Sequence, residues 1–294
     1  MTYDLILGDY AYSSWSLRGW LLLDRFGLPY RTRLLDFNAS ASVGEQLVDL
    51  VLAPARTVPT LVTPEGAIVS DSLAIAEELA SRHPDAGIWP VDPRARATAR
   101  TLAAEMHSGF AALRTACPMN LRTAYAGATP SEAVLADLAR IETLWNHARA
   151  TCIPSGPWLC GDYSAADVFF APVAARIAGY GLPVSDAARA YVAAHLADPA
   201  FRRWRAMGLV RGATLAQYAR PDATIPWPGP APRPARRIDT GTPENAACAY
   251  SGRPVTHLMQ SEGRVFGFCN AFCRDKTAAD PDAWPAFTAL RDNA

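Results

Sequence analysis

The sequence predicts three parts: an α/β domain, an all-α domain and a small C-terminal module that follows a proline-rich linker. Three observations support this prediction. Short apolar strands and amphipathic helices alternate over residues 1–83, whereas only helical patterns follow over residues 90–219. Prolines then crowd residues 220–244, and three cysteines stand in residues 245–294. A chain of 294 residues is long enough for two domains with an appendage.

Composition and charge exclude some classes of function. Half of the residues are hydrophobic and 19% are charged, which is typical of a globular protein. The 28 basic residues are balanced by 28 acidic ones, whereas nucleic-acid binders usually carry a basic excess, so we expect no nucleic-acid partner. The most membrane-like stretch, residues 168–184, contains Pro172, Arg176 and Pro183, and this indicates a buried helix and no membrane span.

The N-terminus and the cysteines indicate the compartment. Residues 1–4 carry no basic segment followed by an apolar run, so we expect no signal peptide. Without export, the six cysteines are expected to be thiols or metal ligands and not a disulfide framework. The prediction is a cytoplasmic protein with no membrane partner.

The first domain is organised around the stretch at residues 9–18. A short strand over 3–7 precedes it, and apolar residues at helical spacing follow it until Gly27. The turn brings the hydroxyls of Ser13 and Ser14 to a helix N-terminus, where unpaired N–H groups and the helix dipole favour an anion. The alternative is that these serines only cap the helix.

The next elements have the order of a thioredoxin-like domain. We expect a strand over 30–35, a short helix over 44–52, a strand ending at 62, a strand over 67–69 and a helix from 70 to 83. The complete order is βαβ, then a helix, then ββα.

The second domain is predicted to be all-helical. Helical patterns cover residues 92–117, 131–150, a segment that opens at 164, 186–196 and 199–207. Ser164 and Asp167 stand three residues apart at the start of an apolar helix, which is the spacing of a capping box. Capping alone accounts for both residues, so we interpret them as structural.

Three motifs resemble those of a glutathione S-transferase. Tyr-Ser-Ser-Trp-Ser-Leu-Arg stands at 12–18, Val-Pro at 58–59 and Asp-Ser at 71–72, in the order and at the separations of that family. The resemblance covers the chain from residue 1 to about residue 215. It implies glutathione as cosubstrate, with the hydroxyl of Ser13 stabilising the glutathione thiolate and Ser14 as the next choice.

The resemblance also implies the rest of the glutathione site. Val58 would pair with the tripeptide through its backbone, with Pro59 in the cis form, and Asp71 and Ser72 would bind the γ-glutamyl end. Two positions depart from the family pattern. The family more often has Glu or Gln in place of Asp71, and its basic residue before the Val-Pro pair is displaced by one place, to Arg56. These departures predict a shifted pose of glutathione.

The implied activity is a glutathione transferase reaction on a small electrophile, catalysed by a homodimer. Serine-type members of the family also include isomerases of the maleylacetoacetate kind, so an isomerase is an alternative. A weakly catalytic protein of the same fold that senses or binds metal is an alternative from another class. The electrophile pocket is expected between the two domains, near Met106 and His107.

The C-terminal module carries a second candidate site. Cys269 and Cys273 stand four residues apart, so they share one face of a helix, and Cys248 precedes them. The run Phe-Gly-Phe-Cys-Asn-Ala-Phe-Cys resembles the TRASH/YHS group of small metal-binding domains, which implies a treble-clef-like module with zinc or Cu(I). Ser251 stands where a second thiol would complete a knuckle, and His257 is the candidate fourth ligand. The alternative is a small flap with packed cysteines.

Overall fold

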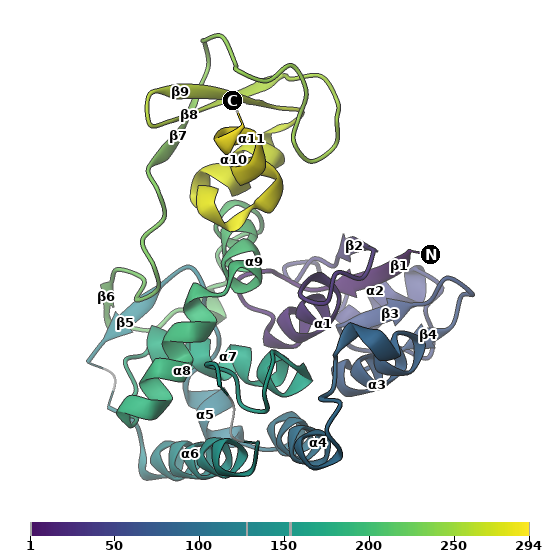
Figure 1. Ribbon diagram of the computed structural model, residues 1–294, viewed down its shortest axis with the longest axis vertical. Helices are drawn as coiled ribbons and strands as arrows, with labels where there is room; N and C mark the ends of the chain where they lie inside the picture. The colour runs from purple at the N-terminus through teal and green to yellow at the C-terminus, as the bar shows by residue number, and fades with distance from the viewer. Residues whose placement is uncertain (1, 128, 153–154, 294) are drawn as a thin grey trace. The chain divides into compact units, whose positions relative to one another are not determined.

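The computed structural model describes residues 2–127, 129–152 and 155–293 (Figure 1). The chain divides into two compact units: Met1–Leu196 with Ala213–Pro228, and Ala197–Gly212 with Gly229–Ala294. The first unit contains β1 (Tyr3–Leu7), α1 (Ser14–Asp24), β2 (Tyr30–Leu34), α2 (Val43–Asp49), β3 (Thr60–Val62), β4 (Ile68–Val69), α3 (Ser72–Arg82), η1 (Pro84–Ala86), α4 (Pro93–Ser108), α5 (Ala111–Ala116), β5 (Ala124–Ala126), α6 (Glu132–Cys152), α7 (Ala165–Gly179), α8 (Asp186–Ala197), η2 (Ala216–Tyr218) and β6 (Ala223–Ile225). The second unit contains α9 (Pro199–Val210), β7 (Ala235–Ile238), β8 (His257–Ser261), β9 (Arg264–Phe268), α10 (Ala271–Ala279), η3 (Pro281–Ala283) and α11 (Pro285–Asp292).

The N-terminal sheet has the strand order β2-β1-β3-β4, in which only the β1–β2 pair is parallel. Neighbouring residues of β1 point to opposite faces of this sheet. Ile6 packs in a cluster with Leu47 of α2, whereas Leu5 lies under Gly19 of α1. A Cβ at Gly19 would lie 2.6 Å from Pro59, so glycine is required for α1 to approach the sheet. The predicted thioredoxin-like order is confirmed.

The helical pattern over residues 92–117 was expected to be continuous, and this expectation is wrong. The first helix, α4, ends at Ser108, and α5 starts at Ala111 after a break. Phe110 has a φ of 60°, in the left-handed region that ends a right-handed helix. The break turns α5 toward the sheet domain, where it becomes one wall of the cavity described below.

The centre of the helical domain is α7, in which nearly every residue is buried. It packs against α1 and α4. The buried carboxylate of Asp167 accepts hydrogen bonds from the N–H groups of Leu159 and Ser164 (3.1 and 3.0 Å) and from the hydroxyl of Tyr191 (2.8 Å). The structural interpretation of Ser164 and Asp167 as a capping box is therefore confirmed. Within the described ranges, no helix combines the length and the apolar character that crossing a bilayer requires.

The expected linker at 220–244 contains two strands. We call Ala213–Pro228 the strap, because it returns from α9 to the first unit. In the strap, β6 pairs antiparallel with β5, and Arg220 donates to the carbonyl groups of Thr115 and Ala116 (3.3 and 3.2 Å). Beyond the strap, β7 joins the sheet of the second unit. The prolines flank both strands and interrupt neither, which is where proline is tolerated.

The second unit is a three-stranded antiparallel sheet, in the order β7-β8-β9, packed with α10 and α9. Its core contains Phe266, Phe268 and Phe287, all fully buried. Arg202 of α9 makes a two-pronged ion pair with Asp280 at the end of α10 (2.8 and 2.6 Å). The expected helical domain at 90–219 included α9, but in the structure α9 packs with the C-terminal module.

His195 gives the first unit a pH-dependent stability. Its ring is buried against Tyr191 and Trp158, and burial lowers its pKa to about 3. The unfolded chain binds the proton near pH 6.5. Since the folded-state pKa is the lower one, stability is complete above about pH 6.5 and falls by up to about 1.4 kcal/mol per pH unit on acidification. His195→Leu should flatten this dependence, as measured by urea unfolding at pH 7, 6 and 5. Equal slopes in both proteins would contradict the assignment.

The packing of α9 predicts the effect of truncation. A chain that ends at Pro228 keeps the strap but loses the partners of Arg202 and Arg203 on the C-terminal module. We expect the first unit to stay folded while residues 199–210 lose protection from amide hydrogen exchange. Exchange measured by mass spectrometry on the full and truncated chains tests this. Equal protection of residues 199–210 in the two chains would show that α9 is stable without the module.

Candidate functional site

A cavity of about 650 Å³ lies at the N-terminus of α1. Its walls come from the turn before α1, the loop before β3, α5 with the loop after it, α7 and the strap. The lining residues are Tyr12, Ser13, Ser14, Trp15, Phe37, Val43, Arg56, Thr57, Val58, Ala111, Arg114, Thr115, Pro118, Met119, Arg176 and Tyr218. The cavity thus brings together Ser13, Ser14, Arg56 and Val58 of the predicted site.

The two serines have different hydrogen bonds. Ser13 is the N-cap of α1: its Oγ accepts from the N–H of Ser16 (3.2 Å) and donates to the Oγ of Ser16 (2.8 Å). The Oγ of Ser16 in turn accepts from the N–H of Gly8 (2.9 Å). Ser14 is the first helical residue, and its Oγ accepts from Nη2 of Arg176 (3.4 Å). Ser13 therefore caps the helix and also lies at the cavity.

Among the described residues that line it, the cavity has three arginines and no aspartate or glutamate. Arg176 is buried and donates to the carbonyl oxygens of Cys117 (2.8 Å) and Pro172 (3.1 Å). Burial, reinforced by the charge of Arg114, lowers the pKa of Arg176 to about 10, so it stays charged near neutral pH. Among the described residues, none forms an ion pair with Arg56, Arg114 or Arg176. The cavity therefore favours an anionic ligand.

A fourth arginine adds to this charge from behind Trp15. The guanidinium of Arg18 lies 4.6 Å from the ring centre of Trp15 and 5.0 Å from that of Phe169. That of Arg114 lies 4.7 Å from the Trp15 ring. Nε and Nη1 of Arg18 are buried without a hydrogen-bond partner in the described part of the chain. Burial lowers the pKa of Arg18, and the nearby charges of Arg176 and Arg114 act in the same direction.

Asp71 and Ser72 lie at the start of α3 and do not line the cavity. The carboxylate of Asp71 accepts from the N–H of Leu73 (3.0 Å) and lies 3.2 Å from Nε2 of His107. The Oγ of Ser72 is fully buried and has no hydrogen-bond partner among the described residues. A buried hydroxyl without a partner costs about 1–3 kcal/mol, and a ligand carboxylate would remove that cost. The Val58–Pro59 peptide bond is cis, as the resemblance implied.

Met106 and His107 lie outside the cavity, although the electrophile pocket was expected near them. Met106 is fully buried in the packing of α4. Burial lowers the pKa of His107, which favours the neutral ring as the partner of Asp71. A wall of the cavity comes from α5 instead. The helical pattern is interrupted at Phe110, and α5 then places Arg114 at the cavity.

Arg176, Arg114 and Tyr218 are among the cavity residues that sequence reasoning missed. Arg176 stands alone among the apolar residues of α7, and a buried cation in an apolar helix is a signal that could have identified it. The position of Arg114 at the cavity depends on the break between α4 and α5, which the sequence pattern does not reveal. Tyr218 stands just before the proline-rich segment and had no local signal.

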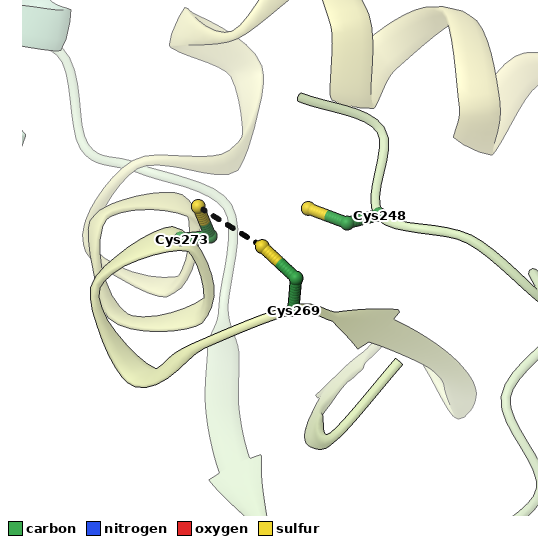
Figure 2. Close-up of side chains that lie close together, drawn as sticks. All are labelled: Cys248, Cys269 and Cys273. Carbon is green, nitrogen blue, oxygen red and sulfur yellow. Dashed lines mark hydrogen bonds between the residues drawn. The ribbon is translucent and has the colours of Figure 1, made fainter. Parts of the chain in front are cut away.

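The second candidate site is formed by three cysteines of the second unit (Figure 2). The sulfur atoms of Cys248, Cys269 and Cys273 all lie within 4.8 Å of one another, and those of Cys269 and Cys273 are 4.0 Å apart. Cys248 comes from the turn before β8, Cys269 follows β9, and Cys273 lies in the first turn of α10. The sequence-predicted cysteines are thus brought together.

The surroundings of these sulfur atoms favour negative charge at one of them. Burial raises the pKa of Cys248, but hydrogen bonds from the backbone N–H groups of Cys269 and Tyr250 outweigh it and lower the pKa to about 7. Burial and the two other thiols raise the pKa of Cys273 to about 12, while the charge of Lys276 acts in the opposite direction. A bound cation would favour deprotonation of all three thiols.

His257 is not part of this cluster. It begins β8, and its Nδ1 lies 2.9 Å from the Oγ1 of Thr256, so the structure does not support the expected fourth ligand. The nearest oxygen donor is Ser251, whose Oγ donates to the sulfur of Cys269 (3.2 Å). Three thiols and one hydroxyl fit a soft ion better than a tetrahedral zinc site with four strong ligands.

Comparison with known proteins finds a likeness for most of the first domain. Residues 12–82 match the family model described as glutathione S-transferase, N-terminal domain. This part of the chain is similar to a glutathione S-transferase N-terminal domain. A probable maleylacetoacetate isomerase of Caenorhabditis elegans is 37% identical over 98 residues, which are 33% of this chain and 42% of the relative. The alignment therefore spans less than half of the curated relative.

Solved structures extend the likeness to the helical domain. A Burkholderia glutathione transferase homologue with bound glutathione is 26% identical, with a TM-score of 0.51, over 69% of this chain and 96% of its own. Glutathione transferase Omega 3C of Trametes versicolor has a TM-score of 0.53 at 19% identity, over 74% of this chain and 91% of its own. The predicted glutathione S-transferase fold, with its thioredoxin-like and helical domains, is confirmed.

Proposed function

We propose that this chain is a glutathione-dependent enzyme in which the thiolate of glutathione attacks a small electrophile that carries a carboxylate. One observation carries the proposal: in the part of the chain that the structure describes, the cavity combines two serines at a helix N-terminus with three arginines and no acidic residue. The glutathione S-transferase N-terminal domain supports glutathione as the cosubstrate. The glutathione bound to the Burkholderia homologue supports it further.

The enzyme's task would be to keep the thiol of glutathione ionised. A thiol is a poor nucleophile near neutral pH because little of it is thiolate. Lowering its pKa by about two units requires about 2.7 kcal/mol of preference for the anion. One hydroxyl donor and one helix N-terminus each supply about 1–2 kcal/mol when partly buried, and the arginines around the cavity add to this.

Ser13 is the proposed donor, with Ser16 as its support. The Oγ of Ser16 already accepts from Gly8, so the Ser16 hydroxyl is able to donate to Ser13 when a thiolate binds. The hydrogen of Ser13 then becomes available to the thiolate. Ser14 is held by Arg176 and would orient that guanidinium toward the ligand.

The other residues would bind the ends of the tripeptide. The backbone of Val58, which lines the cavity, would pair with the cysteinyl part. The unpartnered hydroxyl of Ser72 would bind the γ-glutamyl carboxylate, and Asp71 its ammonium group. Arg56 lies at the cavity and would bind a carboxylate of the tripeptide.

A glutathione-dependent isomerase is the second candidate. The Caenorhabditis elegans relative, a probable maleylacetoacetate isomerase, favours it. Arg114 and Arg176 suit a carboxylate of an unsaturated acid. Thiolate addition to a cis double bond, rotation and elimination would return glutathione unchanged, whereas transfer would consume it. NMR of a cis-unsaturated keto acid with catalytic glutathione separates the two: a stable adduct and no trans product would refute the isomerase.

We also propose that Cys248, Cys269 and Cys273 hold one soft metal ion, Cu(I) in preference to zinc. Their close approach and the adjacent Lys276 support the site. When bound, the ion would cross-link the turn, the end of β9 and α10 in a treble-clef-like module. A metal-sensing protein with little turnover remains the alternative from another class, and undetectable glutathione-dependent turnover with intact metal binding would favour it.

A homodimer in the cytoplasm completes the proposal. It rests on the resemblance to the family and on the balanced charge of the chain. Sedimentation velocity tests the dimer, and a monomer at all concentrations would refute it. Fractionation of the source cells tests the compartment, and recovery of the protein with membranes or outside the cell would refute it.

Ser13→Ala should raise the pKa of enzyme-bound glutathione by about one unit or more while weakening glutathione binding much less, because the hydroxyl favours the thiolate over the thiol. Ultraviolet titration of the bound thiolate measures the pKa, and calorimetry measures the affinity. Ser14→Ala is the matched control and should shift the pKa less. A larger shift in Ser14→Ala would make Ser14 the donor, and no shift in either variant would leave both serines structural.

Replacing Cys269 and Cys273 with serine should abolish binding of one metal ion per chain and raise amide exchange across residues 245–290. Metal–thiolate bonds can contribute about 10 kcal/mol to such a small unit. Elemental analysis and titration with Cu(I) and zinc measure the binding. His257→Ala is the control and should bind the metal as the wild type does. Metal-free wild-type protein with a fully protected module would refute the site.

A further inference from the structure

We infer that the hydroxyl of Tyr218 is the hydrogen-bond donor to the oxyanion that forms when the glutathione thiolate adds to an unsaturated carbonyl compound. This inference rests on the proposed function and names a catalytic group that the thiolate chemistry alone does not require. Its substrate class is an α,β-unsaturated keto acid.

The strap fixes Tyr218 at the cavity from both sides in the sequence. On one side, Leu215 is buried in the first unit. On the other, Arg220 binds the carbonyl groups at the end of α5, and β6 pairs with β5. Between these anchors, the one-turn helix η2 brings Tyr218 to the cavity that Ser13 and Ser14 also line. An anchored segment, and not a mobile tail, therefore supplies the residue.

The neighbours of Tyr218 hold its ring and leave its hydroxyl available. The ring centre lies 4.8 Å from that of Tyr12, at a tilt of 42°, so two aromatic faces fix its orientation. Within the described part of the chain, the hydroxyl donates no hydrogen bond to any residue. Its oxygen is also not one of the fully buried polar atoms that lack a hydrogen-bond partner. Burial raises the pKa of Tyr218, so the O–H keeps its proton near neutral pH.

Arg176 completes the environment of an oxyanion. It is buried, carries its charge at neutral pH and acts electrostatically on Tyr218. It also contacts Ser14, which lies on the side of the cavity where the thiolate would be held. A neutral O–H donor and a fixed guanidinium in the same cavity would stabilise negative charge that develops away from the sulfur.

The movement of electrons during thiolate addition shows which oxygen atom needs a hydrogen-bond donor. The thiolate forms a C–S bond to the β-carbon, the C=C π bond breaks, and its electron pair moves to the carbonyl oxygen as an enolate. The O–H of Tyr218 donates a hydrogen bond to this oxygen and keeps its proton. After rotation about the new single bond, the pair returns, the C–S bond breaks and the thiolate leaves, or water protonates the α-carbon and an adduct is released.

The rates with two electrophiles, measured on the full-length protein, distinguish a catalytic role of Tyr218 from a structural one. With cis-4-oxopent-2-enoate an enolate forms, whereas with chloroacetate the thiolate displaces chloride and no oxyanion develops. Both carry a carboxylate for the arginines. Tyr218→Phe keeps the ring against Tyr12 and should lower kcat for the keto acid about tenfold to a hundredfold. For chloroacetate it should change kcat less than about twofold, with the pKa of bound glutathione unchanged.

Tyr125→Phe is the matched control, because Tyr125 lies on β5 beside the strap, accepts a hydrogen bond from Asn120 and does not line the cavity. It should leave the ratio of the two rates unchanged. Equal loss of both rates in Tyr218→Phe would make Tyr218 only a wall of the cavity, and full retention of both would also overturn the inference. A wild type that lowers the thiol pKa but turns over chloroacetate alone refutes the inference and leaves the transferase proposal intact. A wild type with no bound thiolate refutes both.

Discussion

The cations near the cavity are held by aromatic rings and backbone carbonyl groups, and this constraint decides what the cavity can bind. Trp15 lies between the guanidinium groups of Arg18 and Arg114, while Arg176 donates to carbonyl oxygens. A ring or a carbonyl stabilises a cation without cancelling its charge, whereas a carboxylate would cancel it. Positive potential therefore persists where the helix dipole of α1 adds to it. Burying these charges is unfavourable in the free protein, and an anionic ligand would offset part of that cost.

The sequence predicted those parts of the fold and of the site that depend on local signals. The helix α1 follows from apolar spacing after a serine-rich turn, and its predicted N-terminal residues are the ones that reach the cavity. Cys269 and Cys273 were expected to share one face of a helix, but Asn270 caps α10 and the helix begins at Ala271, so only Cys273 lies on it. The break at Phe110 was not predictable from periodicity, since the apolar pattern continues through it while the backbone enters the left-handed region. Arg114 was missed for this reason.

Contacts between segments far apart in the sequence were not predictable in the same way. Six prolines between residues 221 and 234 indicate an extended chain, but they do not say which surface the chain follows. The strap follows the first unit because the short run between two of these prolines has edge-strand character and meets β5. The place of α9 depends on the ion pair between Arg202 and Asp280, which are 78 residues apart. Neither partner has a local signal that identifies the other.

The cysteine cluster, like the cavity, has a nearby cation that packs against aromatic rings. The ammonium group of Lys276 lies 3.9 Å from the ring centres of both Tyr250 and Trp284, and it lies one turn beyond Cys273 on α10. The rings pack against this cation, and its charge lowers the pKa of the Cys273 thiol. Three thiolates around a monovalent ion carry a net charge of about −2, and around a divalent ion about −1, by the formal charges of the ligands. A fixed cation stabilises the complex of the monovalent ion more than that of the divalent ion, because the Coulomb energy grows with the product of the charges. For the proposed metal site, the arrangement would favour the lower oxidation state of a soft metal, independently of the number of ligands.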